Sequence, residues 1–496
     1  MFDALARDDW RVAARLVAED WAALIARDAT VIEAVADAMP AEAFDEHPEW
    51  IVARSYARHL RLDASVRPLV YADLAPEPDP ADSARVAAIL WTSRAGGART
   101  GGDLPAALDY VARARAAAAA AGGELEQVLP NLQFQWALSH LLADDAPTAI
   151  GLLAEAYAGA EATGNSRTQI NASGELAWLF ALGGRGVDAD AWLARHERLR
   201  AEHPDVTAVH VSGAIARSIR AWDRVDLPLA DELIGAIRLR EAGERIPFLA
   251  GGRLMVRSRL DVACTAALLS EFDTVLSALP PHLDAVPFLA QHNRIIRSEA
   301  LLMRGNAAAA IRMFTEGDHS TGPFAAARRA ISYLLVDDAV RAESEASSVI
   351  AAETGRLRLV IEAHLVRAAL AQRAGDGAGA ADELRLALDL ARAHTCFMPF
   401  SMIPLDELRA LTAAVPGAAG AACAAGAIAS GRMTAVAATA AATAPRVRPV
   451  APRASAGRGV IGCICAPSFL CVGGSCGRDR TPGRRGATLA HCGGGG

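Results

Sequence analysis

The chain has 496 residues and a formal net charge of −7, and all 50 of its basic residues are arginine. The absence of lysine excludes a Walker A phosphate loop, which needs a lysine to reach the β- and γ-phosphates, and it also excludes Schiff-base chemistry. With twelve Phe, five Tyr and few clusters of β-branched residues, the composition favours helices over strands.

Charge is divided unevenly along the sequence. The segment from Pro416 onward has nine Arg and a single acid, Asp479, so its net charge is +8 and that of the preceding body is −15. An acidic body repels phosphate backbones, which makes residues 1–415 an unfavourable nucleic-acid binder. The N-terminus lacks the features of a secretory signal, and no stretch of about eighteen strongly apolar residues is free of charge. We therefore expect a soluble, cytoplasmic protein with no membrane partner.

The first hundred residues are less regular than the rest of the body and contain one proline-rich break. Asp8 and Asp9 precede an apolar-periodic stretch that ends at Leu16, as at a helix start. Three prolines at alternate positions in 76–80 cannot lie inside a helix, so a new helix is expected near Asp82. All the tryptophans fall in the first half, and we interpret them as residues that pack between helices. They are Trp10, Trp21, Trp50, Trp91, Trp136, Trp178, Trp192 and Trp222.

A turn that leads into a helix start recurs through the rest of the body. Successive turns are 32 to 45 residues apart, with a drifting period near 39. This period exceeds the ~34 residues of a strict TPR unit and predicts degenerate TPR-like or HEAT-like helical hairpins. The predicted turns lie at Asp103, Asp145, Gly184, Asp226, Glu271, Asn306, Asp338 and Asp376.

The last hairpin has the clearest helical periodicity. Two apolar stripes at helical spacing flank a turn at 374–377, so the two helices can face each other. The first stripe is Leu357, Ile361, Leu365 and Ala368, and the second is Ala381, Leu384, Leu388 and Ala391.

After about Val415 the helical pattern ends. Residues 417–444 are dominated by Ala, Gly and Thr, and a Gly-, Arg- and Cys-rich stretch follows them. Such a segment has too few large apolar side chains to offset its ordering entropy. The sequence therefore predicts an all-α fold: a TPR-like helical-hairpin superhelix, or solenoid, over residues 1–415 and a disordered, low-complexity tail over residues 416–496.

Two stretches of the body carry a family resemblance. The first runs from Ala4 to Leu16 and continues through Trp21 to 38–40 and 47–50, and the second comprises 387–394, 399–400 and 405–408. They resemble the opening helices and the last repeat of the sensor region in MalT-like LuxR-family transcriptional regulators. In that family an ATPase module, a TPR-like sensor superhelix and a C-terminal helix-turn-helix follow one another, so the resemblance implies a sensor region.

The sequence also departs from that family. No glycine-rich loop with lysine is present, so ATP binding is not implied, and no recognisable helix-turn-helix follows the body. We hypothesise that the tail is an out-of-frame translation of a lost DNA-binding domain, because GC-rich DNA read in the wrong frame yields Ala, Gly, Arg, Pro and unexpected Cys. The nucleotide sequence tests this: if the alternative frames after codon 415 encode no helix-turn-helix, the hypothesis fails.

The tail contains one set of possible metal ligands. The spacing of its cysteines and histidine differs from the paired C-x2-C arrangement of zinc sites, so we expect that they do not form a metal site. A solvated Arg-rich tail is likewise favoured over a nucleic-acid-binding one, because it has few aromatic residues. The possible ligands are Cys463, Cys465, Cys471, Cys476, His491 and Cys492.

Two further patterns in the body resemble binding sites. His196, His203 and His210 recur every seven residues, but Pro204 is expected to end the helix between them, which favours solvated or capping roles. Residues 317–322 superficially suggest a phosphate loop, although without a preceding strand an ordinary inter-repeat loop is favoured.

No acid, base or nucleophile constellation is recognisable, so we expect no enzyme and assign no catalytic, cofactor-binding or metal-binding residue. The predicted function is sensing by the helical-repeat portion of a protein resembling a LuxR-type transcriptional regulator. It would bind a small-molecule or protein effector on the concave face, and DNA only through a missing or separate helix-turn-helix. The alternative is a free-standing TPR-like protein-interaction scaffold.

Overall fold

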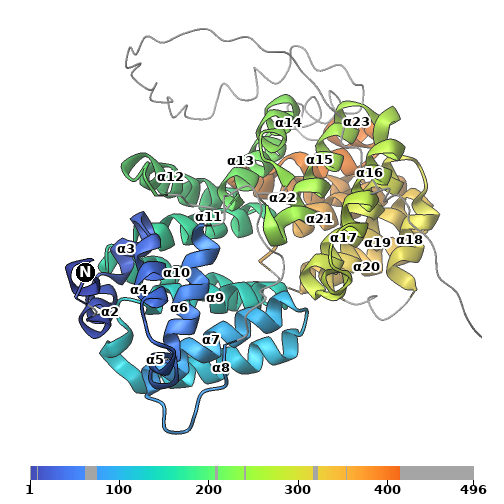
Figure 1. Ribbon diagram of the computed structural model, residues 1–496. Helices are drawn as coiled ribbons and strands as arrows, with labels where there is room; N and C mark the ends of the chain where they lie inside the picture. Colours follow the sequence, from blue (N-terminus) through green and yellow to red (C-terminus); the bar gives the residue numbers. More distant parts are fainter. Residues whose placement is uncertain are drawn as a thin grey trace, which may run out of the picture. The chain divides into compact units, whose positions relative to one another are not determined.

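The computed structural model describes residues 2–7, 9–61, 75–206, 211–239, 242–316, 322–352 and 355–413. All of them belong to one compact unit. The described residues form helices and no strand (Figure 1), which confirms the all-α class. The predicted boundary at residue 415 and the predicted disordered tail lie outside the described residues.

Short helices open the chain and form a small core of their own. Asp9 caps the second helix, where its carboxylate accepts a hydrogen bond from the Val12 amide at 3.2 Å, so the predicted helix start is confirmed. Ile32, Val35 and Trp50 are buried in the core of this part. The helices are α1 (Phe2–Leu5), α2 (Trp10–Glu19), α3 (Trp21–Arg27), α4 (Thr30–Asp37), α5 (Ala41–Glu46) and α6 (Glu49–Arg61).

Pairs of helices joined by short turns follow, as the recurring turns predict. The helix predicted near Asp82 begins at Ala84, with Ser83 as its N-cap. The pairs are α7 (Ala84–Thr100) with α8 (Leu104–Ala121), α9 (Leu129–Leu142) with α10 (Ala146–Ala162), α11 (Ser166–Leu182) with α12 (Gly186–Glu202), α13 (Ser212–Asp223) with α14 (Leu227–Gly235), α15 (Ile246–Leu260) with α16 (Thr265–Ser277), α17 (Pro287–Met303) with α18 (Ala307–Thr315), α19 (Pro323–Leu335) with α20 (Ala339–Ala351), and α21 (Leu357–Arg373) with α22 (Gly377–His394).

Consecutive pairs also pack on one another, as α10 does on α11 and α20 on α21. This arrangement is compatible with the predicted solenoid, while its superhelical form stays a prediction. The last helix, α23, spans Leu405–Ala413. Short 3-10 helices lie in several of the connections between helices, namely η1 (Gly122–Leu125), η3 (Gly243–Arg245), η4 (Val262–Cys264), η5 (Pro281–Ala285) and η6 (Met398–Met402).

One turn geometry recurs within the hairpins. A residue with positive φ ends the first helix, and an Asp or Asn then caps the second helix by accepting a hydrogen bond from a backbone amide three residues later. In the α9–α10 turn, for example, Asp144 has φ of 64° and Asp145 accepts from the Thr148 amide at 3.2 Å. The same cap is made by Asp103, Asp226, Asn306, Asp338 and Asp376.

The turn predicted at Glu271 is wrong. Glu271 lies inside α16, and the turn of this pair is at Asp261, whose carboxylate accepts from the Ala263 amide at 3.0 Å. The acidic residues around 271 suggest a turn, but Phe272 between them is buried in the core with only 1% of its surface exposed. Burial of that ring holds this stretch in the helix.

The final hairpin also contacts the middle of the array. The buried carboxylate of Asp223, at the end of α13, pairs with Arg220 at 2.9 Å and with Arg358, near the start of α21, at 2.6 Å. The Asp223 carbonyl accepts from the Phe397 amide at 2.8 Å, and the Arg220 guanidinium donates to the His394 carbonyl at 3.0 Å. In an open solenoid each repeat contacts only its neighbours. These bonds are a contact of another kind, because they join α13 to a hairpin that is remote in sequence. Arg220, Asp223 and Arg358 are called the closing cluster below.

A glycine-rich turn between α11 and α12 accommodates this contact. Gly184 has φ of 76°, and a Cβ atom there would lie 2.8 Å from the Arg358 backbone nitrogen. A Cβ atom at Gly186 would overlap the His394 carbonyl oxygen. The Gly183 carbonyl accepts a hydrogen bond from the Arg358 amide at 3.2 Å. The turn therefore requires glycine both for its backbone conformation and for the close approach of the final hairpin.

Replacing Asp223 with Asn tests the closing cluster. Asp223→Asn removes the carboxylate that pairs with Arg358 and one of the two that pair with Arg220, so the free energy of unfolding should fall by about 3–5 kcal/mol. Asp231→Asn is the matched control, because Asp231 pairs with Arg257 at 2.9 Å with both side chains partly exposed, and its loss should not exceed about 1 kcal/mol. Urea denaturation measures both, and equal losses would contradict the role given to Asp223.

Candidate ligand-binding cavity

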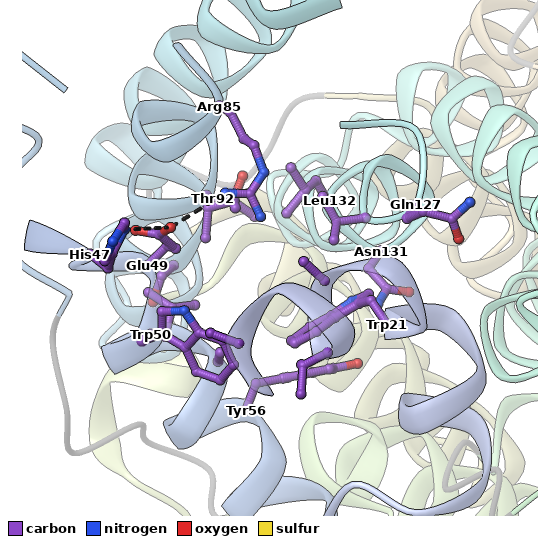
Figure 2. A pocket seen from close by; sticks show the side chains of 18 of the residues that line it. Trp21, His47, Glu49, Trp50, Tyr56, Arg85, Thr92, Gln127, Asn131 and Leu132 are labelled. Atoms are coloured by element: carbon purple, nitrogen blue, oxygen red, sulfur yellow. Dashed lines mark hydrogen bonds and ion pairs between the residues drawn. The ribbon is translucent and has the colours of Figure 1, made fainter. Parts of the chain in front are cut away.

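A cavity of about 630 Å³ lies between the opening helices and the first hairpins (Figure 2). Residues of α2, α3 and α6 form one side, and residues of α7, η1 and α9 form the other. Close-packed interiors have few voids larger than a water molecule. A cavity of this size matches the range of about 300–1,000 Å³ found for small-molecule sites.

Aromatic side chains give the cavity a largely apolar wall. Trp10, Trp21, Trp50 and Tyr56 all line it. In Figure 2, Trp21, Trp50 and Tyr56 lie along the lower side, across from Arg85 and Thr92. The Arg11 guanidinium stacks over the Trp10 ring at 4.4 Å from its centroid. Such rings present large flat apolar surfaces to a ligand at little conformational-entropy cost.

A carboxylate stands at one end of this wall. Glu49, the first residue of α6, pairs with Arg85 of α7 at 3.4 Å and with His47 at 3.7 Å, as the dashed lines in Figure 2 show. Its second oxygen, Oε2, is buried and has no hydrogen-bond partner among the described residues. Glu49 therefore joins two sides of the cavity through its ion pairs and keeps one acceptor free.

Two other lining side chains have unused hydrogen-bond donors. The Trp21 Nε1 and Asn131 Nδ2 atoms are buried and have no acceptor in the described part of the chain. The Asn131 amide oxygen accepts from Asn165 Nδ2 at 3.1 Å and from the Thr168 hydroxyl. Unpaired buried polar groups are costly, so a ligand that supplies acceptors here would be stabilised.

Gly96 opens onto the cavity from the interior of α7. A Cβ atom at this position would meet no atom within 4 Å. Glycine inside a helix is unfavourable by about 1 kcal/mol relative to alanine. The glycine at position 96 therefore destabilises α7 and leaves open a space that a larger side chain would fill.

The interpretation of the tryptophans as packing residues is correct for most of them. Trp136 and Trp178 are buried in the core, Trp91 stacks on Tyr110, and Trp192 packs edge-on against Tyr157. It is incomplete for three, because Trp10, Trp21 and Trp50 also line the cavity. Their clustering in the first fifty residues is the signal that sequence reasoning could have used.

The histidine series does not form a site among the described residues. α12 ends at Glu202, with His203 as its C-cap, which confirms the helix end expected at Pro204. A solvated role for His196 is wrong: its side chain is only 4% exposed, and Nδ1 lies 2.9 Å from the Ile170 carbonyl oxygen. Gly174 of α11 and Gly213 of α13 leave room for the ring, since a Cβ atom at Gly213 would lie 2.5 Å from it.

The other sequence candidates lie mainly beyond the described residues. His210, residues 317–321 and the possible metal ligands of the tail belong to this group, so their interpretation stays a prediction. Within the described ranges, no three or more His, Cys, Asp or Glu side chains are placed to hold a metal ion. Nor is any described helix both long and apolar enough to cross a membrane.

Comparison with known proteins adds no identification: no family model matches the chain, and no curated protein matches its sequence. The cavity is therefore interpreted from its own residues. Its lining contains no nucleophile paired with a base, and its apolar wall with a few fixed polar groups suits reversible binding.

Gly96→Ala should stabilise the protein. Alanine favours the helix by about 1 kcal/mol, and its methyl group would enter open space. Gly213→Ala should have the opposite effect, because its methyl group would collide with the His196 ring. Urea midpoints of the two variants and of the wild type measure the difference. A loss of stability in Gly96→Ala would mean that no open space adjoins this position in solution.

Buried His196 predicts a pH dependence of stability. Burial, chiefly, and the nearby Arg200 and Arg217 charges lower its pKa to about 4, so the unfolded chain binds the proton more tightly. The stabilisation is fully present above about pH 6.5 and is lost as the pH falls towards 4. Burial lowers the pKa of His292 to about 3, which acts in the same direction.

Between pH 7.5 and 5.0 the His196 contribution amounts to about 2 kcal/mol of lost unfolding free energy. His196→Asn, which keeps a donor for the Ile170 carbonyl, should reduce this pH dependence by that amount in urea titrations. His203→Asn is the control and should keep the wild-type dependence. An unchanged dependence in His196→Asn would refute the assignment.

Proposed function

We propose that this chain binds a small, largely apolar molecule in the cavity lined by Trp10, Trp21, Trp50 and Tyr56, and that it acts as a sensor rather than an enzyme. One observation supports this above all: a cavity of about 630 Å³ with an aromatic wall is kept open beside a helix-interior glycine, Gly96. The unpaired polar atoms of Glu49 and Trp21 offer a ligand fixed orientation within it.

Sensing requires that the ligand favours one arrangement of the repeats. The cavity walls come from separate elements, with α3 and α6 on one side and α7 and α9 on the other, so a bound ligand would hold these elements together. The buried helix α11 extends from this region to the closing cluster. Asn165 and Thr168 at its start bond to cavity-lining Asn131, and Gly183 at its end bonds to Arg358.

The wider proposal follows from the family resemblance. A ligand-binding helical array of this kind would be the sensor portion of a cytoplasmic protein resembling MalT-like LuxR-family regulators, and DNA would be contacted only through a helix-turn-helix that is missing or separate. The support is the resemblance in 4–50 and 387–408 together with the cavity in the first of these stretches.

A protein-interaction scaffold is the second candidate, favoured by one surface feature. Leu335, Val336 and Val340, around the α19–α20 turn, are 37%, 44% and 81% exposed. Apolar side chains gathered at one surface position are common in protein interfaces. A scaffold would bind peptides here, and its binding would be insensitive to changes in the cavity.

Blocking the cavity distinguishes the two candidates. Thermal-shift screening with small aromatic amides and alcohols, oligosaccharides and peptides should reveal stabilisation of the wild type by small molecules. Gly96→Phe, whose ring would occupy the cavity, should abolish this stabilisation. Gly151→Phe is the matched control, because Gly151 is an exposed glycine of α10 with open space around it, and it should respond like the wild type.

Two outcomes count against the cavity. Stabilisation by peptides that Gly96→Phe leaves unchanged would favour the scaffold, and so would the absence of any small-molecule response in the wild type.

A further inference from the structure

Arginine side chains lie over most of the tryptophan rings in this structure. In five of the eight tryptophans, a guanidinium carbon lies 4.4 to 4.8 Å from the ring centroid. A cation in this position is attracted by the negative face of the ring. The five are Trp10, Trp91, Trp178, Trp192 and Trp222.

Two of the other three tryptophans line the cavity. Trp136 is buried in the core, with 3% of its surface exposed. Trp21 and Trp50 belong to the cavity lining, and no guanidinium from the described part of the chain lies over either ring. These two indoles are therefore the ones at the cavity to which the described residues present no cation.

The charged side chains of the cavity lining are unequally compensated. Each of its three arginines has a carboxylate partner at 3.4 to 3.9 Å. By contrast, the lining carboxylates of Glu124 and Glu126 are exposed and form neither an ion pair nor a hydrogen bond with the described residues. The lining thus has negative charge to spare around η1. The arginine pairs are Arg11 with Glu46, Arg15 with Glu19 and Arg85 with Glu49.

Carboxylates lie on the same side of the cavity as each of the two indoles. In Figure 2, Trp50 lies beside Glu49, whose buried Oε2 atom has no hydrogen-bond partner among the described residues. Trp21 lies on the side of Gln127, the residue that follows Glu126. Aromatic faces together with nearby negative charge are the features that bind substituted ammonium groups in proteins.

We propose that the cavity binds an organic cation, a substituted ammonium group on an apolar body, which is held by the indole faces of Trp21 and Trp50 and attracted by the carboxylates of Glu124 and Glu126. This inference rests on the proposed function and narrows the ligand to a chemical class. The ligand's cation occupies the position that arginines take over the other rings. An anionic ligand would instead approach two uncompensated carboxylates, and each lining arginine already has a partner.

The experiment compares three probes that share one aromatic body and differ in charge. (2-Naphthylmethyl)trimethylammonium is the cation, 2-naphthylacetamide is the neutral probe and 2-naphthylacetate is the anion. Titration calorimetry on the full chain should show the wild type binding the cation at least about tenfold more tightly than the amide. The anion should bind most weakly.

Paired glutamine variants test the carboxylates. Glu124→Gln combined with Glu126→Gln should lower the cation affinity about three- to tenfold and leave the amide affinity unchanged. Glu161→Gln combined with Glu232→Gln is the matched control, because it removes two exposed carboxylates outside the cavity lining. Since all four side chains are exposed, both double variants should melt like the wild type. An equal cation affinity in the two double variants would overturn the role given to Glu124 and Glu126.

Replacing Trp21 tests the indole. Trp21→Leu keeps an apolar side chain but has no ring to attract a cation, so the preference for the cation over the amide should fall. Trp192→Leu is the control, because Trp192 lies outside the cavity lining with Arg195 over its ring, and it should keep the wild-type preference. A general loss of packing would weaken both probes and leave their ratio unchanged, and this outcome in Trp21→Leu would overturn the role of the ring.

The remaining outcomes distinguish this inference from the proposed function. If the wild type binds the cation and the amide equally, or the anion most tightly, the cation site is overturned and the cavity stays. Failure of all three probes to bind would count against the cavity and the cation site together. Tetramethylammonium is the last probe, and binding as tight as that of the naphthyl cation would overturn the role of the apolar body.

Discussion

A single buried carboxylate, that of Asp223, holds together parts of the chain that are far apart in sequence. It faces Arg220 of its own helix and Arg358 of the final hairpin, and its backbone carbonyl binds the Phe397 amide. Every group in this contact is compensated, since the Arg220 guanidinium also reaches Asp190 at 3.0 Å. The glycines of the α11–α12 turn allow the same contact, because a side chain at Gly186 would collide with the final hairpin. This contact therefore fixes the final hairpin against α13, a relation that packing between neighbouring repeats does not determine.

The cavity differs from the closing cluster in its packing and in the pairing of its polar groups. In the cluster, opposite charges are matched and close packing leaves no room for a methyl group. Around the cavity, by contrast, Gly96 adjoins open space, and Glu49 and Trp21 each have a buried polar atom with no partner in the part of the chain that the structure describes. Stability would be served by filling this space and pairing these atoms. This contrast distinguishes the residues of the closing cluster, which stabilise the fold, from the residues of the cavity, which we assign to binding.

Much of the fold could be predicted from the sequence because its hairpins are local. Asp103 and Asp376 mark helix starts through a bond to a backbone amide three residues away, and the stripes that contain Ile361 and Leu384 have helical spacing. Glu271 shows the limit, since the burial of its neighbour Phe272 overrides the local turn signal. The cavity cannot be predicted from the sequence for a related reason. Trp21, Tyr56 and Asn131 come from three different helices, and no spacing in one sequence reveals such a convergence.

The separation in sequence within the closing contact also constrains the order in which the protein can form. Arg220 bonds to Thr395, 175 residues further along the chain. Each hairpin up to that point has its own short-range contacts and can assemble as soon as its two helices have been synthesised. The carboxylate of Asp223 cannot acquire its second arginine until the chain has been extended beyond Arg358. During synthesis, therefore, the middle hairpins present a charged, glycine-lined surface that only the last part of the array covers.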